Sequence, residues 1–348
     1  MSTSSVSLES RIKGAIFGTA VADALGGPVE FSRRGSFPKV TDYQANLNFR
    51  LPPGAWTDDT SMTLCLAQSL IDTKTFSPAS QLQNYIAWYD SGYLSSTGHC
   101  FDIGNLTRLT LSFWGKHIPV KNFSSSKNIS NLPSDEVIER LQKELNKHYA
   151  RAAYCGNGSL MRTVPIGLFY HSSPEEEIIK FSHSASQLTH PYHTNGEACA
   201  AYNLLVAYTL SSASSTGRTP SKQALFEKFK AFEFEDKSLK DRFAVYESLD
   251  DFENREEQLI SSSGYVVHSL EAALWAFFTT DDWAEGALKV VNLGDDADTV
   301  GAIYGGLAGA YYGLEAIPEK WKVGLVEKDV VGKIAEELWK VIVERSGN

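Results

Sequence analysis

Hydrophobic positions recur with a helical period over most of the chain. The i, i+4, i+7, i+8 stripe occurs in three segments: Ile334, Leu338, Val341 and Ile342; Trp283, Ala287, Val290 and Val291; and Ile303, Leu307, Ala310 and Tyr311. Residues 192–210, rich in Ala, Leu and Tyr, predict a long buried helix. Alternating patterns typical of half-buried strands are scarce. The sequence therefore predicts an all-α fold, a compact multi-helix bundle.

Three stretches interrupt this pattern and predict loops. Residues 119–134 are rich in Ser, Asn, Lys and Pro, residues 211–221 carry residues that break helices, and residues 233–262 are heavily charged and weakly patterned. A length of 348 residues allows one large domain or two closely packed ones. Because none of the stretches resembles an interdomain linker, we expect a single domain over residues 8–346, with loop insertions at 119–134 and 233–262.

Glycines cluster inside several predicted helices, at Gly14, Gly18, Gly305, Gly306 and Gly309. Each glycine in a helix interior costs about 1 kcal/mol of helix propensity relative to alanine. Two interpretations remain open. Either the helix backbones pack unusually closely, or a ligand approaches the main chain.

Composition and charge narrow the range of partners. The formal net charge is −10, which makes the chain a poor non-specific partner for nucleic acids or anionic membranes. The first five residues, MSTSS, lack the basic and apolar regions of a signal peptide, and no apolar run of about 18 residues is present. Cysteines 65, 100, 155 and 199 show no CxxC spacing and predict buried thiols rather than disulfides. We expect a cytoplasmic monomer without nucleic-acid or membrane partners.

The first acidic cluster follows a Pro-Pro-Gly sequence at residues 52–54. Thr57 can cap a helix whose first turn carries Asp58 and Asp59. Such a cap, with acids favoured by the helix dipole, is a sufficient structural reason for the pattern. Taken alone, this cluster therefore leaves a capping role and a metal-binding role open.

The second acidic cluster is more informative. Asp295, Asp296 and Asp298 lie within four residues, after Gly294 and before an apolar helix. Their mutual repulsion needs compensation, and a helix dipole supplies only about 0.3–1 kcal/mol per charge. Hard oxygen ligands without a nearby His or Cys favour Mg²⁺, with Mn²⁺ also suitable. If the two clusters meet in space, they could hold two ions that orient a substrate and activate a water molecule.

Four motifs in order resemble the ADP-ribosylglycohydrolase family. They are residues 14–26 with Glu30 (GxxxGxxxxDALG), residues 56–62 (WTDDTSM), residues 156–162 (GNGSLMR) and residues 294–301 (GDDADTVG). The resemblance covers about residues 10 to 315. Residues 92–105 (GYLSSTGHCFDIGN) and 189–191 (THP) resemble the arginine-directed branch typified by dinitrogenase reductase-activating glycohydrolase.

The resemblance implies a role for each matching position, in a compact all-α bundle. It implies two Mg²⁺ ions (Mn²⁺ being possible) with ligands Thr57, Asp58, Asp59, Asp296, Asp298 and Thr299. Asp295 falls outside the pattern and is interpreted as a neighbouring group. Glu30 matches an acid on a flexible segment near the metals, and Asp102 and Asn105 would face the departing arginine. ADP-ribose contacts are implied for Gly156, Asn157, Gly158, Ser159, Met161 and His190.

The implied reaction is hydrolysis of the N-glycosidic bond between ADP-ribose and an arginine side chain of a modified protein. Such hydrolysis passes through an oxocarbenium-like transition state. Asp59 or Glu30 is a candidate base for the water, and Asp102 is a candidate acid for the leaving guanidine.

Other functions remain as alternatives. These are hydrolysis of serine-linked or other O-linked ADP-ribose, and a non-catalytic, crystallin-like relative. A prenyl-transfer enzyme is disfavoured because such enzymes use Asp-Asp-x-x-Asp, which neither acidic cluster matches. Simpler structural roles also exist for four positions: Asp102 could cap the helix near Asn105, His190 could precede a helix start, Asn157 could be a turn residue, and Glu30 a surface acid.

Overall fold

The computed structural model describes residues 6–119 and 132–346. In these ranges the chain forms α-helices and short 3₁₀-helices, with two isolated β-bridges, Asn46–Leu51 and Gly156–Tyr265, and no strand. The all-α prediction is therefore confirmed.

The α-helices are α1 (Leu8–Gly26), α2 (Asp58–Thr73), α3 (Pro78–Ser91), α4 (Asn105–Trp114), α5 (Asp135–Tyr149), α6 (Val164–Phe169), α7 (Glu175–Gln187), α8 (His193–Thr216), α9 (Lys222–Lys230), α10 (Lys237–Phe243), α11 (Asp250–Glu253), α12 (Val266–Phe278), α13 (Trp283–Val291), α14 (Ala297–Tyr312), α15 (Glu319–Gly324) and α16 (Lys328–Ser346). The 3₁₀-helices are η1 (Gly27–Val29), η3 (Ala152–Tyr154), η4 (Glu257–Leu259) and η5 (Leu314–Ala316).

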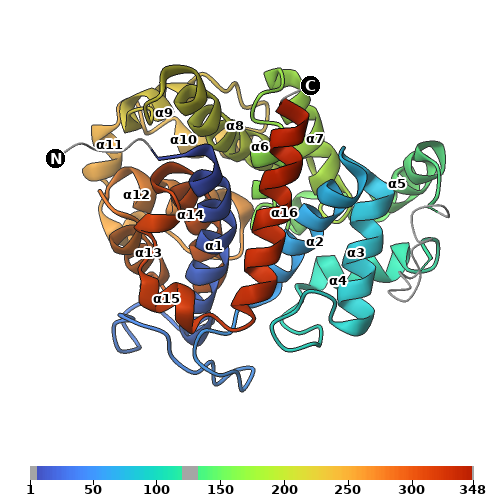
Figure 1. Ribbon diagram of the computed structural model, residues 1–348, viewed down its shortest axis with the longest axis horizontal. Helices are drawn as coiled ribbons and strands as arrows, with labels where there is room; N and C mark the ends of the chain where they lie inside the picture. Colours follow the sequence, from blue (N-terminus) through green and yellow to red (C-terminus); the bar gives the residue numbers. More distant parts are fainter. Residues whose placement is uncertain (1–5, 120–131, 347–348) are drawn as a thin grey trace.

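Helix α1 lies in the middle of the bundle (Figure 1). It packs against α14, α16 and α2, and α14 in turn packs against α12, α13 and α8. Helices α2 to α5 lie on one side of α1 and α16 in Figure 1, and α9 to α15 lie on the other. Buried hydrophobic side chains form one continuous cluster that reaches from Ile12 to Ile342.

The contact between α1 and α14 explains the glycines in both helices. A Cβ atom on Gly14 would lie 2.6 Å from the carbonyl oxygen of Gly309, and one on Gly301 would lie 2.7 Å from that of Ala22. Gly18 and Gly305 also meet backbone to backbone. Real Cβ atoms do not approach other atoms so closely, so larger residues would force the helices apart. Close backbone packing is therefore the role of Gly14, Gly18, Gly305 and Gly309, whereas a Cβ atom on Gly306 would meet the Tyr202 hydroxyl at 2.6 Å.

The same contacts fix the relative direction of the two helices. Position 14 faces 309, position 18 faces 305, and position 22 faces 301, so the helices are antiparallel. The last turn of α1 therefore lies beside the first turn of α14. In this way the glycine contacts bring Asp23, on α1, next to Asp298, at the start of α14.

Two of the predicted loops differ from the structure. Helix α8 includes the predicted helix 192–210 from His193 but continues through Ser and Ala residues to Thr216, and it ends at Gly217 in the left-handed conformation. The expectation of a loop over 211–216 is thus wrong. Serine and alanine are tolerated in an exposed final turn, and Gly217 provides the stop.

The expectation of a loop over residues 233–262 also differs from the structure, which forms short helices in part of this segment. It contains α10, α11 and η4, and the side chains of Leu239, Phe243 and Phe252 are buried in the core. These helices are too short to show a clear periodicity, and tertiary packing determines them. Of the predicted insertion at 119–134, residues 120–131 lie outside the described residues.

Among the helices described here, none has both the length and the apolar character that a membrane span requires.

Candidate metal centre and substrate cleft

The first acidic cluster lies at the start of α2, as predicted. Thr57 occupies the N-cap position, and Asp58 and Asp59 form the first turn. The Thr57 hydroxyl, however, does not cap its own helix. Its oxygen lies 3.0 Å from Oδ1 of Asp23, 3.0 Å from Oδ2 of Asp59 and 3.4 Å from Oδ2 of Asp298. The side chain therefore faces a group of carboxylates, which a simple capping role does not explain.

The second acidic cluster lies at the start of α14. Asp296 is the N-cap residue, and Asp298 and Thr299 follow in the first turn. Oδ1 of Asp298 accepts a hydrogen bond from the backbone N–H of Thr299 at 2.9 Å. The side-chain amide of Asn157 donates to Oδ2 of Asp296 at 2.7 Å.

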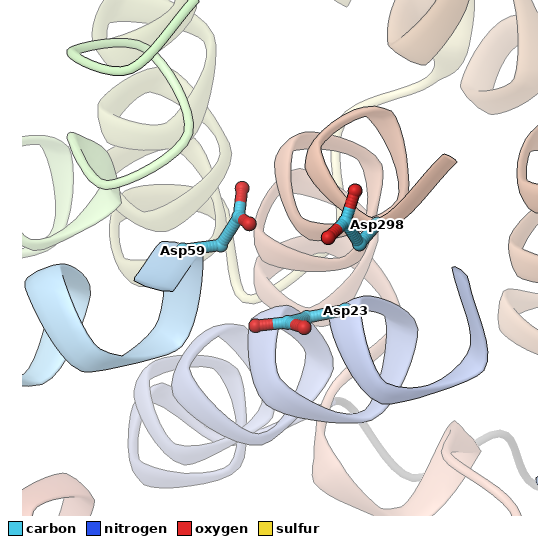
Figure 2. A group of neighbouring side chains, drawn as sticks. All are labelled: Asp23, Asp59 and Asp298. Atoms are coloured by element: carbon cyan, nitrogen blue, oxygen red, sulfur yellow. The ribbon is translucent and has the colours of Figure 1, made fainter. Parts of the chain in front are cut away.

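The two clusters meet in space. Carboxylate oxygens of Asp23, Asp59 and Asp298 lie within 4.8 Å of one another, and so do those of Glu30, Asp296 and Asp298. Figure 2 shows the side chains of Asp23, Asp59 and Asp298 gathered between α1, α2 and α14. Asp298 belongs to both groups and joins them into one acidic centre.

Asp23 is the residue of this centre to which the sequence assigned no role. It is fully buried, and its carboxylate accepts the backbone N–H of Thr57 at 2.9 Å and that of Thr60 at 3.1 Å. The Thr60 hydroxyl donates to it at 2.6 Å. The N–H of the third helical residue is the one that an N-cap side chain normally accepts. Asp23 thus caps α2 from another helix, and the available signal was its place in the motif at residues 14–26.

Burial and mutual repulsion dominate the electrostatics of the centre. The pKa values of Asp58, Asp59 and Asp298 are raised well above their usual range, first because the groups are buried and second because other carboxylates surround them. Burial also raises the pKa of Asp23 to about 6, although hydrogen bonds from Thr60 and Thr57 oppose the shift. So many buried acids need positive charge nearby to remain ionised.

Glu30 and Asp102 form a carboxyl pair at the edge of this centre. Glu30 follows η1, and Asp102 precedes α4 in a left-handed backbone conformation. Burial, and then the neighbouring Asp102, raise the pKa of Glu30 to about 10, and burial raises that of Asp102 to about 7. Because Gly104 is the N-cap residue of α4, Asp102 does not have the capping role considered for it.

The centre opens into a cleft of about 800 Å³. This volume lies in the range of small-molecule sites. The cleft is lined by most of the predicted site residues, namely Glu30, Asp58, Asp102, Asn105, Gly156, Asn157, Gly158, Met161, His190, Asp296, Asp298 and Thr299. Thr57 and Asp59 are fully buried and do not line it. Phe31, Phe49 and Tyr154 also line the cleft, and sequence reasoning had not singled them out.

The segment at residues 156–162 forms a turn along one wall. The N–H of Leu160 and that of Met161 donate to the carbonyl oxygen of Asn157, at 2.8 and 3.1 Å. The hydroxyl of Ser159 accepts a hydrogen bond from Ser186 in the core at 2.9 Å. Its side chain therefore points away from the cleft, which leaves only its backbone to contact a ligand.

Asp295 stands apart from the other acids. Its side chain is exposed, and its backbone is left-handed, with φ 53°. Its main chain pairs with the segment after Glu30: the N–H of Phe31 donates to Asp295 O at 2.7 Å, and the N–H of Asp295 donates to Ser32 O at 2.8 Å. Asp295 thus supports the Glu30 segment through its backbone.

The donor set of the centre fits divalent cations. Three buried carboxylate oxygens, Asp59 Oδ1, Glu30 Oε2 and Asp102 Oδ2, have no hydrogen-bond donor among the described residues. Carboxylate and hydroxyl oxygens are the ligands that Mg²⁺ and Mn²⁺ prefer. A cation would also relieve the repulsion that raises the pKa values of these acids.

Comparison with known proteins gives a consistent result. The family model described as ADP-ribosylglycohydrolase matches residues 4–348. The ADP-ribosylarginine hydrolase Tri1 of Serratia proteamaculans is 32% identical over 334 residues, which cover 96% of this chain and 80% of that protein. The ADP-ribosyl-[dinitrogen reductase] glycohydrolase of Rhodospirillum rubrum is 26% identical over 323 residues, or 90% of each chain.

A more distant relative and a solved structure also have names from the ADP-ribosylhydrolase and ADP-ribosylglycohydrolase group. The ADP-ribosylhydrolase ARH3 of Mus musculus is 24% identical over 379 aligned residues, covering 97% of this chain and 93% of that protein. A solved structure named ADP-ribosylglycohydrolase-related protein complex superposes with a TM-score of 0.73 at 33% identity, covering 96% of this chain and 99% of that chain. The family model and these relatives, together with the acidic centre, show that the chain belongs to the ADP-ribosylglycohydrolase family.

Proposed function

We propose that this protein hydrolyses the N-glycosidic bond between ADP-ribose and an arginine side chain of a modified protein, with two divalent cations, Mg²⁺ or Mn²⁺, as cofactors. The main support is one observation. The starts of α2 and α14 converge on a single acidic centre that opens, beside Glu30 and Asp102, into a cleft of suitable volume.

The carboxyl pair favours arginine as the leaving side. A guanidinium ion is a planar cation that carboxylates bind well, and both Glu30 and Asp102 line the cleft. A serine hydroxyl is neutral, so two carboxylates would bind it less strongly than a guanidinium cation. The relative at 32% identity is named an ADP-ribosylarginine hydrolase, whereas ARH3 is at 24%. Serine-linked ADP-ribose is therefore the second candidate substrate.

The cations would be held by Thr57, Asp58, Asp59, Asp296, Asp298 and Thr299, with Glu30 beside them. When bound, they would supply Lewis acidity toward the ribose hydroxyls and lower the pKa of a water molecule. Asp23 would act indirectly, because its carboxylate already accepts hydrogen bonds from Thr57 and Thr60 and holds the first turn of α2 in place.

The remaining roles follow from position in the cleft. Of the two candidate bases, Glu30 lines the cleft and Asp59 does not, so we assign Glu30 the proton of the attacking water. This role requires that bound cations lower the pKa of Glu30, which burial and neighbouring carboxylates otherwise raise. Asp102 would orient the guanidine and return a proton to it as the bond to the anomeric carbon breaks. Asn157, His190 and the backbone of residues 156–159 would hold the ADP-ribose part.

The test uses arginine-linked and serine-linked ADP-ribosyl peptides, each with Mg²⁺ and with a chelator. We expect release of ADP-ribose from the arginine peptide with Mg²⁺, and loss of that activity with the chelator. Asp298→Asn should lower the rate at least about 100-fold, the scale of losing an essential catalytic group. Asp295→Asn is the matched control, because it changes an adjacent but exposed acid and asparagine tolerates a left-handed backbone.

Three results would contradict the proposal. Full activity in chelator, or in Asp298→Asn, would exclude the metal mechanism. Faster cleavage of the serine peptide would replace arginine with serine as the substrate. No release from either peptide, with the protein folded and Mg²⁺ present, would favour a non-catalytic relative.

A further inference from the structure

Arg162 is a buried cation that the proposed reaction does not use. Its side chain is 1% exposed, and its hydrogen bonds in the described part of the chain go to neutral groups. Its guanidinium lies 4.7 Å from the centre of the Tyr85 ring. Burying a charge without a counter-charge is costly, so the hydrogen bonds of Arg162 must compensate for much of that cost.

Those hydrogen bonds lead toward the cleft in two directions. One terminal nitrogen, Nη1, donates to the carbonyl oxygen of Gly158 at 2.8 Å. The other, Nη2, donates to Oγ1 of Thr189 at 2.6 Å, and Thr189 Oγ1 lies 2.8 Å from Nδ1 of His190. Arg162 therefore contacts the turn that lines the cleft directly, and it reaches the histidine opposite that turn through Thr189.

The Thr189 hydroxyl determines which nitrogen of His190 carries the proton. A guanidinium can only donate, so Thr189 must accept from Arg162. The hydroxyl has one proton of its own, and Nδ1 of His190 is its remaining partner. Nδ1 then accepts this hydrogen bond, and the imidazole proton lies on Nε2. The opposite tautomer would leave the Thr189 proton without an acceptor inside the core, where Thr189 is fully buried.

Nε2 of His190 faces the turn and the cleft. His190 lines the cleft together with Gly156 and Gly158, and a Cβ atom on Gly158 would lie 3.1 Å from Nε2 and 2.8 Å from Cε1. Among the described residues, Nε2 has no hydrogen-bond partner, and the backbone N–H groups of Gly158 and Ser159 have no acceptor. His190 and Gly158 line the cleft, so the Nε2–H group and the N–H of Gly158 can donate to a ligand on this wall.

The imidazole is also held in its neutral form. Burial lowers the pKa of His190 well below its usual range, and the positive charge of Arg162 lowers it further. A neutral ring with a single proton on Nε2 is a donor of fixed direction. It suits an anionic oxygen without adding another buried charge.

We propose that Arg162 and Thr189 are positioning residues that fix His190 as a neutral donor, protonated on Nε2, for a phosphate oxygen of the ADP-ribose diphosphate. The identity of the ligand, the ADP-ribose diphosphate, rests on the proposed function. The position of the proton on His190 rests on the hydrogen bonds alone. Arg162 acts through Thr189 and through the Gly158 carbonyl, and neither Arg162 nor Thr189 lines the cleft.

The proton position is measured on the full-length protein labelled with ¹⁵N and without ligand. Long-range ¹H–¹⁵N correlation spectra distinguish a protonated from an unprotonated ring nitrogen, and a His190→Gln variant assigns the His190 signals. We expect one neutral tautomer, with Nε2 protonated and Nδ1 unprotonated. In Thr189→Val, which keeps the shape but removes the hydroxyl, the ring should show a mixture of tautomers. Thr189→Ser retains the hydroxyl and should restore the single form.

Calorimetric measurement of ADP-ribose binding tests whether His190 donates to the ADP-ribose diphosphate. Thr189→Val should weaken binding about tenfold, the size of one lost hydrogen bond to a charged group, and Thr189→Ser should bind like the wild type. With a cleavable substrate, KM should rise while kcat changes little.

The two proposals can fail separately. A wild-type spectrum with Nδ1 protonated, or with a charged ring, would overturn the proton assignment whatever the enzyme hydrolyses. Unchanged affinity for ADP-ribose in a folded Thr189→Val variant would overturn the role in binding of the hydrogen bonds that join Arg162, Thr189 and His190. Absence of ADP-ribose binding by the wild type would overturn the proposed function and the ligand named here, but not the tautomer.

Discussion

The side-chain amide of Asn157 joins the turn at residues 156–162 to the second acidic cluster. Its nitrogen donates to Oδ2 of Asp296 at 2.7 Å and to Oγ of Ser269, on α12, at 2.9 Å. One oxygen of Asp296 is therefore oriented by a residue from a distant part of the sequence. Asp296 is one of the proposed metal ligands, and groups that orient such ligands are important for metal affinity.

Replacing Asn157 should weaken metal binding. Asn157→Ala removes the donor to Asp296 and leaves that carboxylate free to rotate. We expect the apparent Mg²⁺ or Mn²⁺ affinity to fall about 10- to 100-fold, the range for lost partners of metal ligands. Titration of the metal-dependent rise in melting temperature measures this affinity without an activity assay.

Ser269→Ala is the control for this prediction. It removes the other partner of the Asn157 amide but leaves the hydrogen bond to Asp296 in place. Its metal affinity should stay within about twofold of the wild type, since no donor to a ligand is lost. Equal losses in both variants would show that general loosening of the turn, and not the bond to Asp296, controls affinity.

The contact between α1 and α14 should tolerate no added methyl group. Gly14→Ala would place a Cβ atom 2.6 Å from Gly309 O and 2.7 Å from the backbone of Gly313 and Leu314. We expect the free energy of unfolding in urea to fall by about 1–3 kcal/mol, because overpacking outweighs the gain of about 1 kcal/mol in helix propensity.

A second helical glycine provides the opposite case. At Gly332 on α16, an added Cβ atom would meet only the Phe17 ring, at 3.6 Å, which is ordinary contact. Gly332→Ala should therefore stabilise the protein by up to about 1 kcal/mol. Destabilisation of similar size at both positions would mean that close backbone approach is not what selects glycine at position 14.

The starts of α2 and α14 could be predicted because local signals mark them. A Gly precedes each, and Thr57 or Asp296 stands where an N-cap residue is favoured. Only the structure shows that the Thr57 side chain does not cap its own helix and that its hydroxyl faces three carboxylates from separate helices. Whether two helix starts meet depends on how the bundle packs, and local sequence does not encode that.

Asp23 and the segment at 233–262 also depend on tertiary contacts that local sequence does not reveal. Asp23 lies in the last turns of α1 without a cap or turn signal, and its function depends on a contact with Thr57 and Thr60. Helices α10 and α11 are only seven and four residues long, so their hydrophobic period is too short to recognise. Burial of Phe243 and Phe252 decides their conformation, and that burial is a property of the whole fold.

Asp298→Asn should affect stability in opposite ways with and without metal. In chelator at about pH 8, this buried acid either stays charged among other carboxylates or takes up a proton, and both are unfavourable. The variant should therefore be more stable than the wild type, by an amount on the order of 1 kcal/mol. Mg²⁺ at about 100 times its Kd should add about 2.7 kcal/mol to the wild type and little to the variant.

Urea unfolding of both proteins, in chelator and in Mg²⁺, measures the four values. Asp295→Asn again serves as the control, because its exposed side chain should leave the Mg²⁺ response intact. If Mg²⁺ stabilised the wild type and Asp298→Asn equally, the ion would be bound elsewhere on the protein.

The neutral state of His190 has a consequence for the pH dependence of stability. Burial and then Arg162 hold its pKa well below the usual value, so the unfolded chain binds a proton near pH 6.5 that the folded chain does not.

The contribution of neutral His190 to the free energy of unfolding is complete above about pH 6.5. It is lost as pH falls toward the lower folded pKa, by up to about 1.4 kcal/mol per pH unit. His190→Gln, which cannot titrate, should lack this contribution to the slope. The difference in unfolding free energy between wild type and variant should therefore shrink between about pH 7 and about pH 5.5. A constant difference over that range would contradict the prediction, because it would show that folding does not change the pKa of His190.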